Sequence, residues 1–455
     1  MSTKHSKAAA EFLKNKKQAA WHDETLWLVR AKRDRLSKEV PEWEELRNMA
    51  CATKLYSNSH LDELLVEFEN NARANGAHVY WAKDADEYCN IVYNILNQHG
   101  VKHFIKSKSM LAEECELNPF LESKGIEVVE SDLGERILQL MHLKPSHIVL
   151  PAIHIKREQV GELFEREMGT EKGNFDPTYL THAARKNLRQ KFIHAEAAMT
   201  GANFAVASTG EIVVCTNEGN ADMGTSQPKL QIAAFGMEKI VPDRESLGVF
   251  TRLLARSATG QPITTYTSHY RKPREGGEYH IIIVDNGRSK ILADPKHIKT
   301  LNCIRCGACM NTCPVYRRSG GYSYTYFIPG PIGINLGMLK APLHYYDNVS
   351  ACSLCYSCSF VCPAEVDLAE QIYLWRQDLD KLGKADRMKK VMSGGMEFMM
   401  NRPSIFNMAL KWAPLVNGVP RFLIYNGLND WGEGREMPKF AKESFNEMWK
   451  KGKVK

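Results

Sequence analysis

Two short cysteine motifs in the second half of the chain are the residues best suited to chemistry. The first is CIRCGACMNTCP, residues 303–314, and the second is CSLCYSCSFVCP, residues 352–363. Both have the spacing C-x2-C-x2-C-x3-C-P. Gaps of two residues let three thiolates bind one iron–sulfur cube, and the longer gap with its proline turns the fourth cysteine away. The spacing therefore predicts two [4Fe–4S] clusters.

The fourth cysteine of each motif is expected to bind the cluster of the other motif, as in two-cluster ferredoxins. The first cluster then has as its ligands Cys303, Cys306, Cys309 and Cys362. The second has Cys352, Cys355, Cys358 and Cys313. Structural zinc is the alternative, because paired C-x2-C motifs also build tetrahedral zinc sites. The repeated spacing with proline is much more specific than a paired C-x2-C, and it favours iron–sulfur clusters.

The residues around the motifs indicate how the clusters would be tuned and shielded. Arg305, Arg317 and Arg318 lie near the first motif, where positive charge would raise a reduction potential; plain surface charge is the alternative. Residues 319–337, rich in Gly, Pro and Tyr, predict an ordered loop and not a helix. Shielding a cluster is its simplest role, and lining an acceptor site, such as for a quinone, is the other. Residues 339–355 favour a helix, as in an α-helical ferredoxin.

The elements that must position these motifs are helices at both ends of the chain and an α/β region between them. Apolar spacings of three and four predict helices over residues 1–72. Strands are expected at 77–82, 102–108, 125–131, 202–208, 211–215, 230–235, 263–268 and 279–285, with a short apolar run at 146–153. Residues 157–199 are expected to be helical. Alternating strands and helices indicate βαβ units and a mostly parallel sheet.

Two helices of this region carry capping signals at their start. Asp84 with Glu87, and Asp132 with Glu135, have the three-residue separation of a capping box. These pairs predict helices that begin at about residues 85 and 133.

Polar residues at the ends of strands in the α/β region are candidates for ligand binding. Lys106, Ser107, Lys108 and Ser109 follow a strand and open a helix, so they could bind an anion. Further candidates are the polar loop Asn217, Glu218, Gly219 and Asn220, and the group His154, Lys156 and Arg157. An ordinary turn, cap or surface loop is the alternative for each. No dinucleotide fingerprint, P-loop or catalytic triad is present, so no catalytic residue is predicted.

Composition limits the class of protein. The 455 residues are 44% hydrophobic, enough for two to four domains with their own cores. The net charge of +7 is mild for this length and does not indicate a nucleic-acid partner. No secretory segment and no apolar run of membrane-spanning length is seen. We expect a cytoplasmic protein, peripheral to the membrane at most, with reduced thiols. The cysteines outside the motifs are Cys51, Cys89, Cys115 and Cys215; core packing is expected for Cys89 and Cys215.

The combination of segments gives the chain a specific resemblance. KSKSMLAEE, ESDLGERILQL, PSHIVLPAIHIKREQ and STGEIVV precede CIRCGACMNTCPVYR and GPIG. From about residue 60 to about 400 the chain resembles the lactate utilization protein B family, iron–sulfur proteins with a LUD domain. The resemblance implies a NagB/CoA-transferase-like α/β fold. It also implies LutA-like and LutC-like partners in a system that oxidises L-lactate to pyruvate, in which the B protein relays electrons through its clusters.

These observations predict four regions. They are an N-terminal helical segment (1–76), the α/β LUD domain (77–290), an α-helical ferredoxin domain with two clusters (291–375) and a C-terminal helical extension (376–455). Core packing is expected for the Met and aromatic residues of the extension; docking to a partner or a membrane surface is the alternative.

The expected function is electron transfer within an L-lactate dehydrogenase complex, toward a respiratory acceptor protein or quinone. Three alternatives stay open. The electron donor could be another hydroxy-acid dehydrogenase. The LUD domain could itself be catalytic, which substitution of Lys106, Glu113 and Asn217 would test. The clusters could only brace a binding protein.

Overall fold

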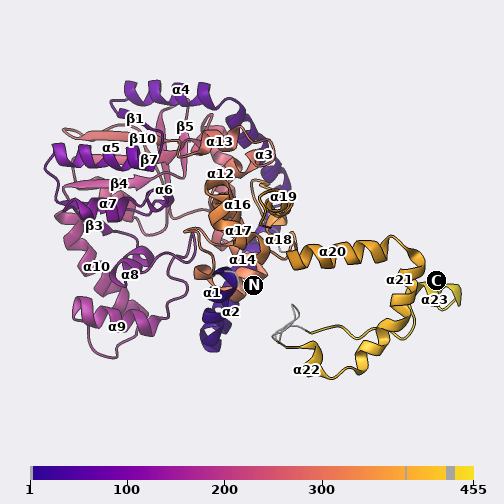
Figure 1. Ribbon diagram of the computed structural model, residues 1–455. Coiled ribbons are helices and arrows are strands. Elements are labelled where there is room, and N and C mark those ends of the chain that lie inside the picture. The colour runs from indigo at the N-terminus through magenta and orange to yellow at the C-terminus, as the bar shows by residue number, and fades with distance from the viewer. Residues whose placement is uncertain (1–3, 385–386, 427–435, 455) are drawn as a thin grey trace. The chain divides into compact units, whose positions relative to one another are not determined.

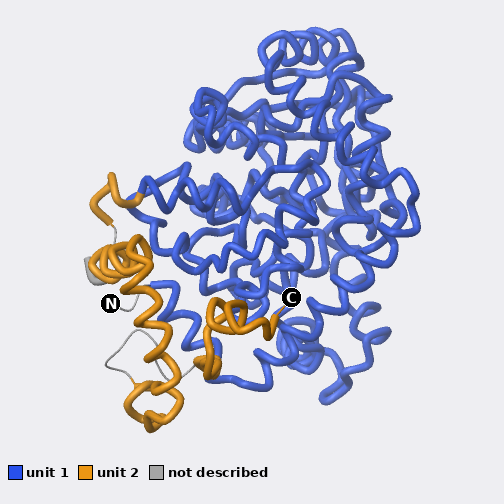
Figure 2. The backbone as a smooth tube through the Cα atoms, turned by 90° about the vertical axis from the view of Figure 1, so that its right-hand side faces the viewer, with its two compact units in different colours: residues 1–378 blue, residues 379–455 orange. Residues whose placement is uncertain are grey.

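The computed structural model describes residues 4–384, 387–426 and 436–454. It divides into two compact units, residues 1–378 and residues 379–455, which Figure 2 shows in different colours. The first unit contains the α/β region and both cysteine motifs. Within the described ranges, none of the helices combines the length and the hydropathy that a membrane crossing requires.

The centre of the first unit is a six-stranded parallel sheet (Figure 1). Its strands, in spatial order, are β1 (His78–Ala82), β10 (Glu278–Val284), β7 (Leu230–Gly236), β4 (Ala197–Gly201), β2 (His103–Lys106) and β3 (Glu127–Glu130). All five neighbouring pairs are parallel. The prediction of a mostly parallel sheet is confirmed, and the parallel carboxyl ends place the ends of β2, β3, β4 and β7 along one edge.

Both faces of this sheet are covered, as the apolar runs in its strands require. On β10, Ile282 and Val284 join one core with α5 (Ala85–Gln98) and α7 (Leu117–Ser123). The alternate residues Ile281 and Ile283 join a second core. This second core contains α4 (Leu61–Ala74) and strands of a smaller sheet. Because successive side chains of a strand point to opposite faces of the sheet, β10 contributes side chains to both cores.

The smaller sheet has four strands and mixed pairing. Its order is β8 (Ile240–Val241), β5 (Phe204–Val206), β6 (Glu211–Thr216) and β9 (Tyr266–Tyr270). The pairs β5–β6 and β6–β9 are antiparallel, and β5–β8 is parallel. Between and around the sheets lie α6 (Met110–Glu114), α8 (Leu133–Leu140), α9 (Arg157–Met168), α10 (Pro177–Ile193), α11 (Asn220–Ser226), η1 (Met237–Lys239), α12 (Arg244–Thr259) and α13 (Arg288–Leu292).

The predicted N-terminal helices form and lead into the α/β region. They are α1 (Lys4–Lys14), α2 (Lys16–Lys38), α3 (Trp43–Ser59) and α4. The cysteine region that follows the sheets is also helical, as predicted for 339–355. Its elements are η2 (Ile298–Asn302), α14 (Ala308–Thr312), α15 (Pro314–Ser319), η3 (Gly321–Ser323), α16 (Gly330–Lys340), α17 (Pro342–Ala351), α18 (Ser357–Phe360) and α19 (Leu368–Lys381).

Two predictions about secondary structure are wrong. The helix expected over 157–199 ends at Ile193, and the central strand β4 begins at Ala197. The sequence of β4, AAMTG, is buried throughout and lacks the β-branched alternation that marks a strand. The loop expected over 319–337 contains the start of α16, because Pro331 occupies the first turn of a helix, where proline is tolerated. The apolar run at 146–153 forms no helix or strand.

The second unit consists of short helices. They are α20 (Arg387–Met400), α21 (Pro403–Trp412), η4 (Ala413–Gly418), α22 (Arg421–Ile424) and α23 (Phe445–Lys450). Two hydrogen bonds join Asn417 to Phe440 within the unit. From residue 380 onward, none of the residues whose burial the structure describes is buried. Core packing of the Met and aromatic side chains, expected from the sequence, is therefore not seen in this unit.

Candidate metal centre and adjoining cavity

The two cysteine motifs have the same local backbone. In the first, Arg305 and Gly307 have positive φ of 60° and 76°; in the second, the equivalent Leu354 and Tyr356 have φ of 53° and 60°. A short helix, α14 or α18, follows each loop. Non-glycine residues in the left-handed region cost about 1–2 kcal/mol each, and such strain is retained where a site requires it. The two motifs therefore share one loop conformation, with left-handed residues at equivalent positions between their first three cysteines.

Cysteines from both motifs line one small cavity. Cys303, Cys306 and Cys309 come from the first motif, and Cys362 from the second. Burial is the main cause that raises the pKa of the Cys306 thiol to about 12. Among the neighbouring groups, Cys362 adds the most to this rise. The four thiols are the predicted ligands of the first cluster. The structure therefore brings the last cysteine of one motif to the centre of the other.

The remaining four cysteines are neighbours in the same crossed way. Burial raises the pKa of the Cys313 thiol to about 11; its backbone hydrogen bonds oppose the rise, and the adjacent Cys352 and Cys355 add to it. Burial raises the pKa of the Cys358 thiol as well, with Cys313 as its strongest neighbour. The last cysteine of the first motif thus lies beside the second.

The donor set fits iron–sulfur clusters. Backbone N–H groups donate to sulfur at three of the cysteines: Leu354 to Cys352 at 3.3 Å, Val366 to Cys362 at 3.4 Å and Tyr316 to Cys313 at 3.5 Å. Hydrogen bonds to sulfur are one means by which proteins tune a cluster. The raised thiol pKa values mean that metal binding must displace protons. Within the described ranges, no group of three or more His, Cys, Asp or Glu side chains is placed as it would be around a single metal ion.

The N-terminal helices hold both motifs, which the sequence did not predict. On α2, Arg30 bonds Ser357 Oγ at 3.3 Å and also Thr312, and Arg33 donates to the Val361 carbonyl at 3.1 Å. On α3, the Arg47 guanidinium donates to the carbonyl of Cys362 at 3.0 Å. These contacts fix the two motifs relative to each other because α2 binds both motifs, and α3 adds a further contact to the second.

The three arginines expected near the first cluster have different partners. Arg317 and Arg318 bind the carboxylate of Asp23 on α2 at 2.6 and 3.0 Å. Arg305 is only partly buried, with a side chain 10% exposed, and its guanidinium lies 3.8 Å from Glu238. The loop after the first motif shields this region, since Tyr324 is buried beside Cys313.

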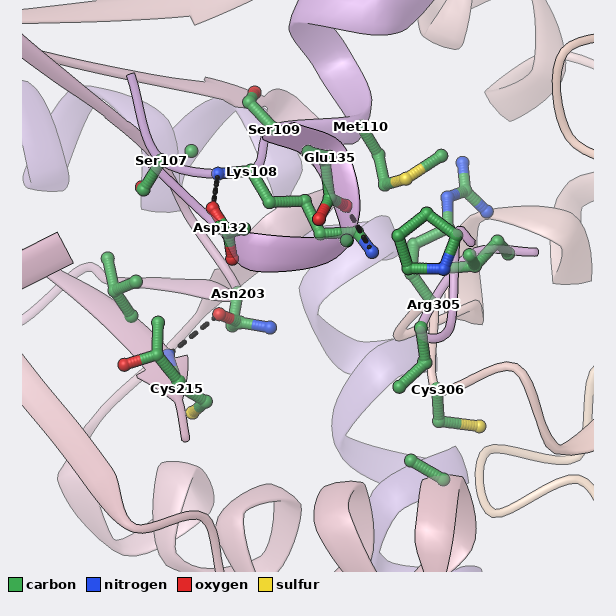
Figure 3. Close-up of a pocket in the computed structure, with 18 of the residues that line it drawn as sticks. Ser107, Lys108, Ser109, Met110, Asp132, Glu135, Asn203, Cys215, Arg305 and Cys306 are labelled. Atoms are coloured by element: carbon green, nitrogen blue, oxygen red, sulfur yellow. Dashed lines mark hydrogen bonds and ion pairs between the residues drawn. The ribbon is translucent and has the colours of Figure 1, made fainter. Parts of the chain in front are cut away.

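A second, much larger cavity of about 600 Å³ lies where β2, β3, β4 and β7 end (Figure 3). Its wall includes the ends of these strands, the loop 148–153 and the α12 residues Leu254, Ala255 and Ala258. Arg305 and Cys306 of the first cysteine motif also line it. The same two residues line the small cysteine cavity, so the two cavities adjoin.

Three of the four residues proposed for an anion site line the large cavity, and the fourth does not. Ser107, Lys108 and Ser109 line the large cavity. The side chain of Lys106 is fully buried, and its amine binds the Glu130 carboxylate at 2.7 Å outside the cavity lining. In the polar loop 217–220, Asn217, Glu218 and Asn220 line the cavity.

The candidate residues His154, Lys156 and Arg157 have contacts outside the large cavity. His154 bonds Ser146 Oγ at 2.6 Å, and Arg157 pairs with the neighbouring Glu158. Lys156 lies over the ring of Trp21. None of His154, Lys156 and Arg157 lines the cavity.

One capping prediction is confirmed and the other is wrong. Asp84 accepts a hydrogen bond from the Glu87 N–H at 2.9 Å and caps α5. Asp132 forms no capping bond; its carboxylate accepts from the Lys108 N–H at 2.6 Å. Glu135 forms an ion pair with the Lys108 amine at 2.7 Å. Asp132 and Glu135 both line the cavity, so side chains that resembled a helix cap are part of this wall (Figure 3).

The cysteines outside the motifs have no common site. Cys51, Cys89 and Cys115 are buried, and Cys89 lies 3.3 Å from the Cys115 carbonyl. Cys215 is half-buried and lines the large cavity. Core packing is therefore confirmed for Cys89. Cys215 is packed only in part, because one side of it lines the large cavity.

Comparison with known proteins decides the family. A LUD domain model matches residues 65–292, and a 4Fe-4S dicluster domain model matches residues 299–366. Lactate utilization protein B of Bacillus pumilus is 40% identical over 428 residues, 91% of this chain and 90% of that protein. The chain belongs to the lactate utilization protein B family. Its large cavity is formed mostly by the LUD domain, and its eight motif cysteines lie in the dicluster domain.

Other relatives extend over similar lengths. Lactate utilization protein B of Geobacillus thermodenitrificans is 42% identical over 386 residues, 83% of this chain and 81% of that protein. An Escherichia coli K12 protein named "Uncharacterized electron transport protein YkgF" is 37% identical over 437 residues, 93% of this chain and 91% of that protein. The family resemblance predicted from the LUD segments and the cysteine motifs is confirmed.

Proposed function

We propose that this lactate utilization protein B homologue carries two [4Fe–4S] clusters with crossed ligands. The first cluster is held by Cys303, Cys306, Cys309 and Cys362. The second is held by Cys352, Cys355, Cys358 and Cys313. The observation that carries this proposal is the shared cavity of Cys362 with the first three cysteines of the other motif. When bound, the clusters supply reversible one-electron transfer, and the chain's own residues hold them, shield them and donate hydrogen bonds to their sulfur ligands.

The clusters form an electron relay in a system that oxidises L-lactate to pyruvate. The names of the relatives support a role in lactate utilization and in electron transport. LutA-like and LutC-like proteins are the proposed partners, and a respiratory acceptor receives the electrons. The chain acts on the cytoplasmic side of the membrane.

The decisive experiment is anaerobic EPR of the chain with its two proposed partners, before and after L-lactate is added. We expect a reduced [4Fe–4S] signal after lactate, and no signal when the partners are left out. Dithionite is the control for clusters that can be reduced at all. A signal with dithionite but none with lactate would contradict lactate as the electron source. The absence of both signals would contradict the electron relay.

A second candidate function is favoured by the large cavity. A LUD domain that only docked partners would not need a cavity of about 600 Å³ that reaches a cysteine of the first motif. Catalysis or ligand binding in the LUD domain is therefore an alternative to pure relay. Of the residues chosen from the sequence to test this, Asn217 lines the cavity, whereas Lys106 and Glu113 do not.

A further inference from the structure

The large cavity has the size and the lining of a site for an organic ring. Ligand sites for molecules of drug or cofactor size have volumes of about 300–1,000 Å³ and mostly apolar walls. The wall here includes Met110, Leu111, Ile148, Ile153, Phe235 and Leu254. A three-carbon hydroxy acid would fill only a small part of this space and would leave most of its apolar wall uncovered. The occupant should therefore be larger and largely apolar.

Polar groups in the wall provide hydrogen-bond donors. On the β2 side, the Lys108 amine pairs with the Glu135 carboxylate, and the backbone N–H of Lys108 donates to the Asp132 carboxyl (Figure 3). Burial raises the pKa of the Asp132 carboxyl, and the adjacent Glu135 adds to the rise, whereas Lys108 acts against it. At the dicluster domain, the Arg305 side chain is 10% exposed, and its Nη1 has no hydrogen-bond partner among the described residues. The wall thus contains exchangeable protons on Lys108 and Asp132 and a largely enclosed cation.

The adjoining metal centre sets the chemistry that the occupant needs. Cys306 is a proposed ligand of the first cluster and also lines the large cavity. A cluster exchanges one electron at a time, whereas oxidation of a hydroxy acid to a keto acid removes two electrons and two protons. A small hydroxy acid in this cavity would therefore need a further two-electron acceptor. A planar carrier that accepts electrons singly and also takes up protons meets both requirements.

We propose that the LUD cavity binds a planar, proton-coupled two-electron carrier, a quinone-type or flavin-type ring, beside Cys306. The ring gains two electrons and two protons, and its two carbonyl oxygens become hydroxyls if it is a quinone. One electron comes from each of the two reduced clusters. The protons come from Lys108 and Asp132 and are replaced from water. This inference rests on the proposed function only in assuming that the clusters carry electrons.

The test measures binding directly. Holoprotein, purified without oxygen, is titrated by calorimetry with menadione in one arm and with flavin mononucleotide in the other. We expect one arm to show a single saturable site. Ile153→Trp fills the cavity from the loop 148–153 and should weaken that binding by about tenfold or more. Lys108→Met removes a donor from the wall and should weaken it less.

The controls separate binding from folding and from lactate chemistry. Ile193→Trp makes the same substitution at a 53% exposed position at the end of α10, outside the cavity, and should bind like the unchanged chain. Iron content and the dithionite EPR signal should be equal in all variants. No binding in either arm, or equal binding by the Ile153→Trp and Ile193→Trp variants, would overturn the proposal. Neither result depends on lactate, so failure of the lactate experiment leaves the binding result intact.

A different observation, the charge and exposure of the second unit, carries a separate inference. Residues 379–455 contain fifteen Lys and Arg and eight Asp and Glu, a net charge of +7 that equals the charge of the whole chain. Residues 1–378 are therefore neutral overall. Large apolar side chains are exposed in the same unit: Val391, Met392, Met396, Phe398, Trp412 and Phe422. From residue 380 onward none of the residues whose burial is described is buried, and a segment so rich in exposed aromatic and Met side chains and in cations has the composition of an interfacial membrane anchor.

We infer that residues 379–455 bind the surface of an anionic membrane. Exposed Trp and Phe side chains would enter the headgroup region, and the Lys and Arg excess would contact anionic headgroups. Arg402, stacked 3.8 Å from the ring centroid of Phe398, combines both features in one contact. The exposed Trp, Phe and Met side chains beside this charge favour a lipid surface, because aromatic side chains concentrate at membrane interfaces.

The full-length holoprotein is sedimented with vesicles of phosphatidylglycerol and phosphatidylcholine, and with vesicles of phosphatidylcholine alone. We expect binding only to the first, and less of it at high salt. The double variant Trp412→Glu/Phe422→Glu, at positions 63% and 72% exposed, should lower the bound fraction about tenfold.

The control is Leu28→Glu/Val66→Glu, at positions 64% and 54% exposed in the first unit, which should bind normally. Equal binding by the two double variants would overturn the inference. So would an oligomer of the unchanged chain that only Trp412→Glu/Phe422→Glu dissociates, because a second copy would then cover this surface.

Discussion

Replacing Cys362 with serine is expected to remove the first cluster and to leave the second. The reason is the crossed ligation: Cys362 is the last cysteine of the second motif but lies in the cavity of Cys303, Cys306 and Cys309. Iron should fall from about eight to about four atoms per chain, because each cubane has four irons. Iron analysis and dithionite EPR of the anaerobically purified variant measure this loss.

Pairs of variants test the crossing itself. If the ligands cross, Cys362→Ser and Cys303→Ser should retain the same cluster and give the same EPR spectrum. Cys313→Ser and Cys352→Ser should retain the other cluster and share a different spectrum. Cys89→Ser, at a buried cysteine far from both motifs in sequence, should keep all its iron.

Uncrossed ligation gives the opposite grouping. Cys362→Ser would then match Cys352→Ser, and Cys313→Ser would match Cys303→Ser. Zinc in place of iron in the purified protein would contradict both arrangements. The spectra therefore distinguish the two ligand sets without a need for lactate or a partner.

The cysteine chemistry was predictable because it depends on local spacing. The positions of Cys303, Cys306 and Cys309 within a few residues define three ligands, and the proline after each fourth cysteine indicates that the chain turns away. The parallel sheet was predictable for a similar reason, since strands such as β10 carry long β-branched runs. Local patterns therefore predicted the metal centre and most of the sheet.

The rest depends on contacts between distant segments. Strand β4 has no β-branched pattern, because its small residues are enclosed on both faces of the sheet. Asp132 and Glu135 match a capping box, yet both bind Lys108, which is more than twenty residues away. The cavity could not be predicted at all, because its wall combines strand ends with Cys306 of the dicluster domain. Such long-range pairings leave no periodic signal in the sequence.

The second large effect is expected at a buried charge network on the wall of the cavity. Arg288, on α13, binds the carboxylates of Glu114 on α6, at 2.9 Å, and of Glu238 on η1. All three side chains are at most 12% exposed. Burial acts to raise the pKa of Glu238, but Arg288, Lys239 and Arg305 outweigh it and lower this pKa to about 2. Arg288 thus connects three separate segments of the LUD domain beside the first cysteine motif.

Arg288→Met should destabilise the chain by about 3–5 kcal/mol, because it leaves two buried carboxylates without their shared cation. The shift of the urea unfolding transition of the holoprotein, followed by circular dichroism, measures this change. Adding Glu238→Gln to Arg288→Met should recover part of the loss, since it removes one of the two unpaired charges.

The matched control is Arg157→Met, which removes a 66% exposed guanidinium whose one ion pair among the described residues is with the neighbouring Glu158. An exposed pair of this kind contributes about 0–1 kcal/mol, so the unfolding transition should hardly move. If Arg288→Met shifted the transition no more than Arg157→Met, the network would not stabilise the cavity wall. If Glu238→Gln worsened the Arg288→Met variant, the hydrogen bonds of Glu238 would matter more than its charge. Recovery by Glu238→Gln would instead show that unpaired negative charge is the source of the instability, which is the result that burial and the short contacts to Arg288 predict.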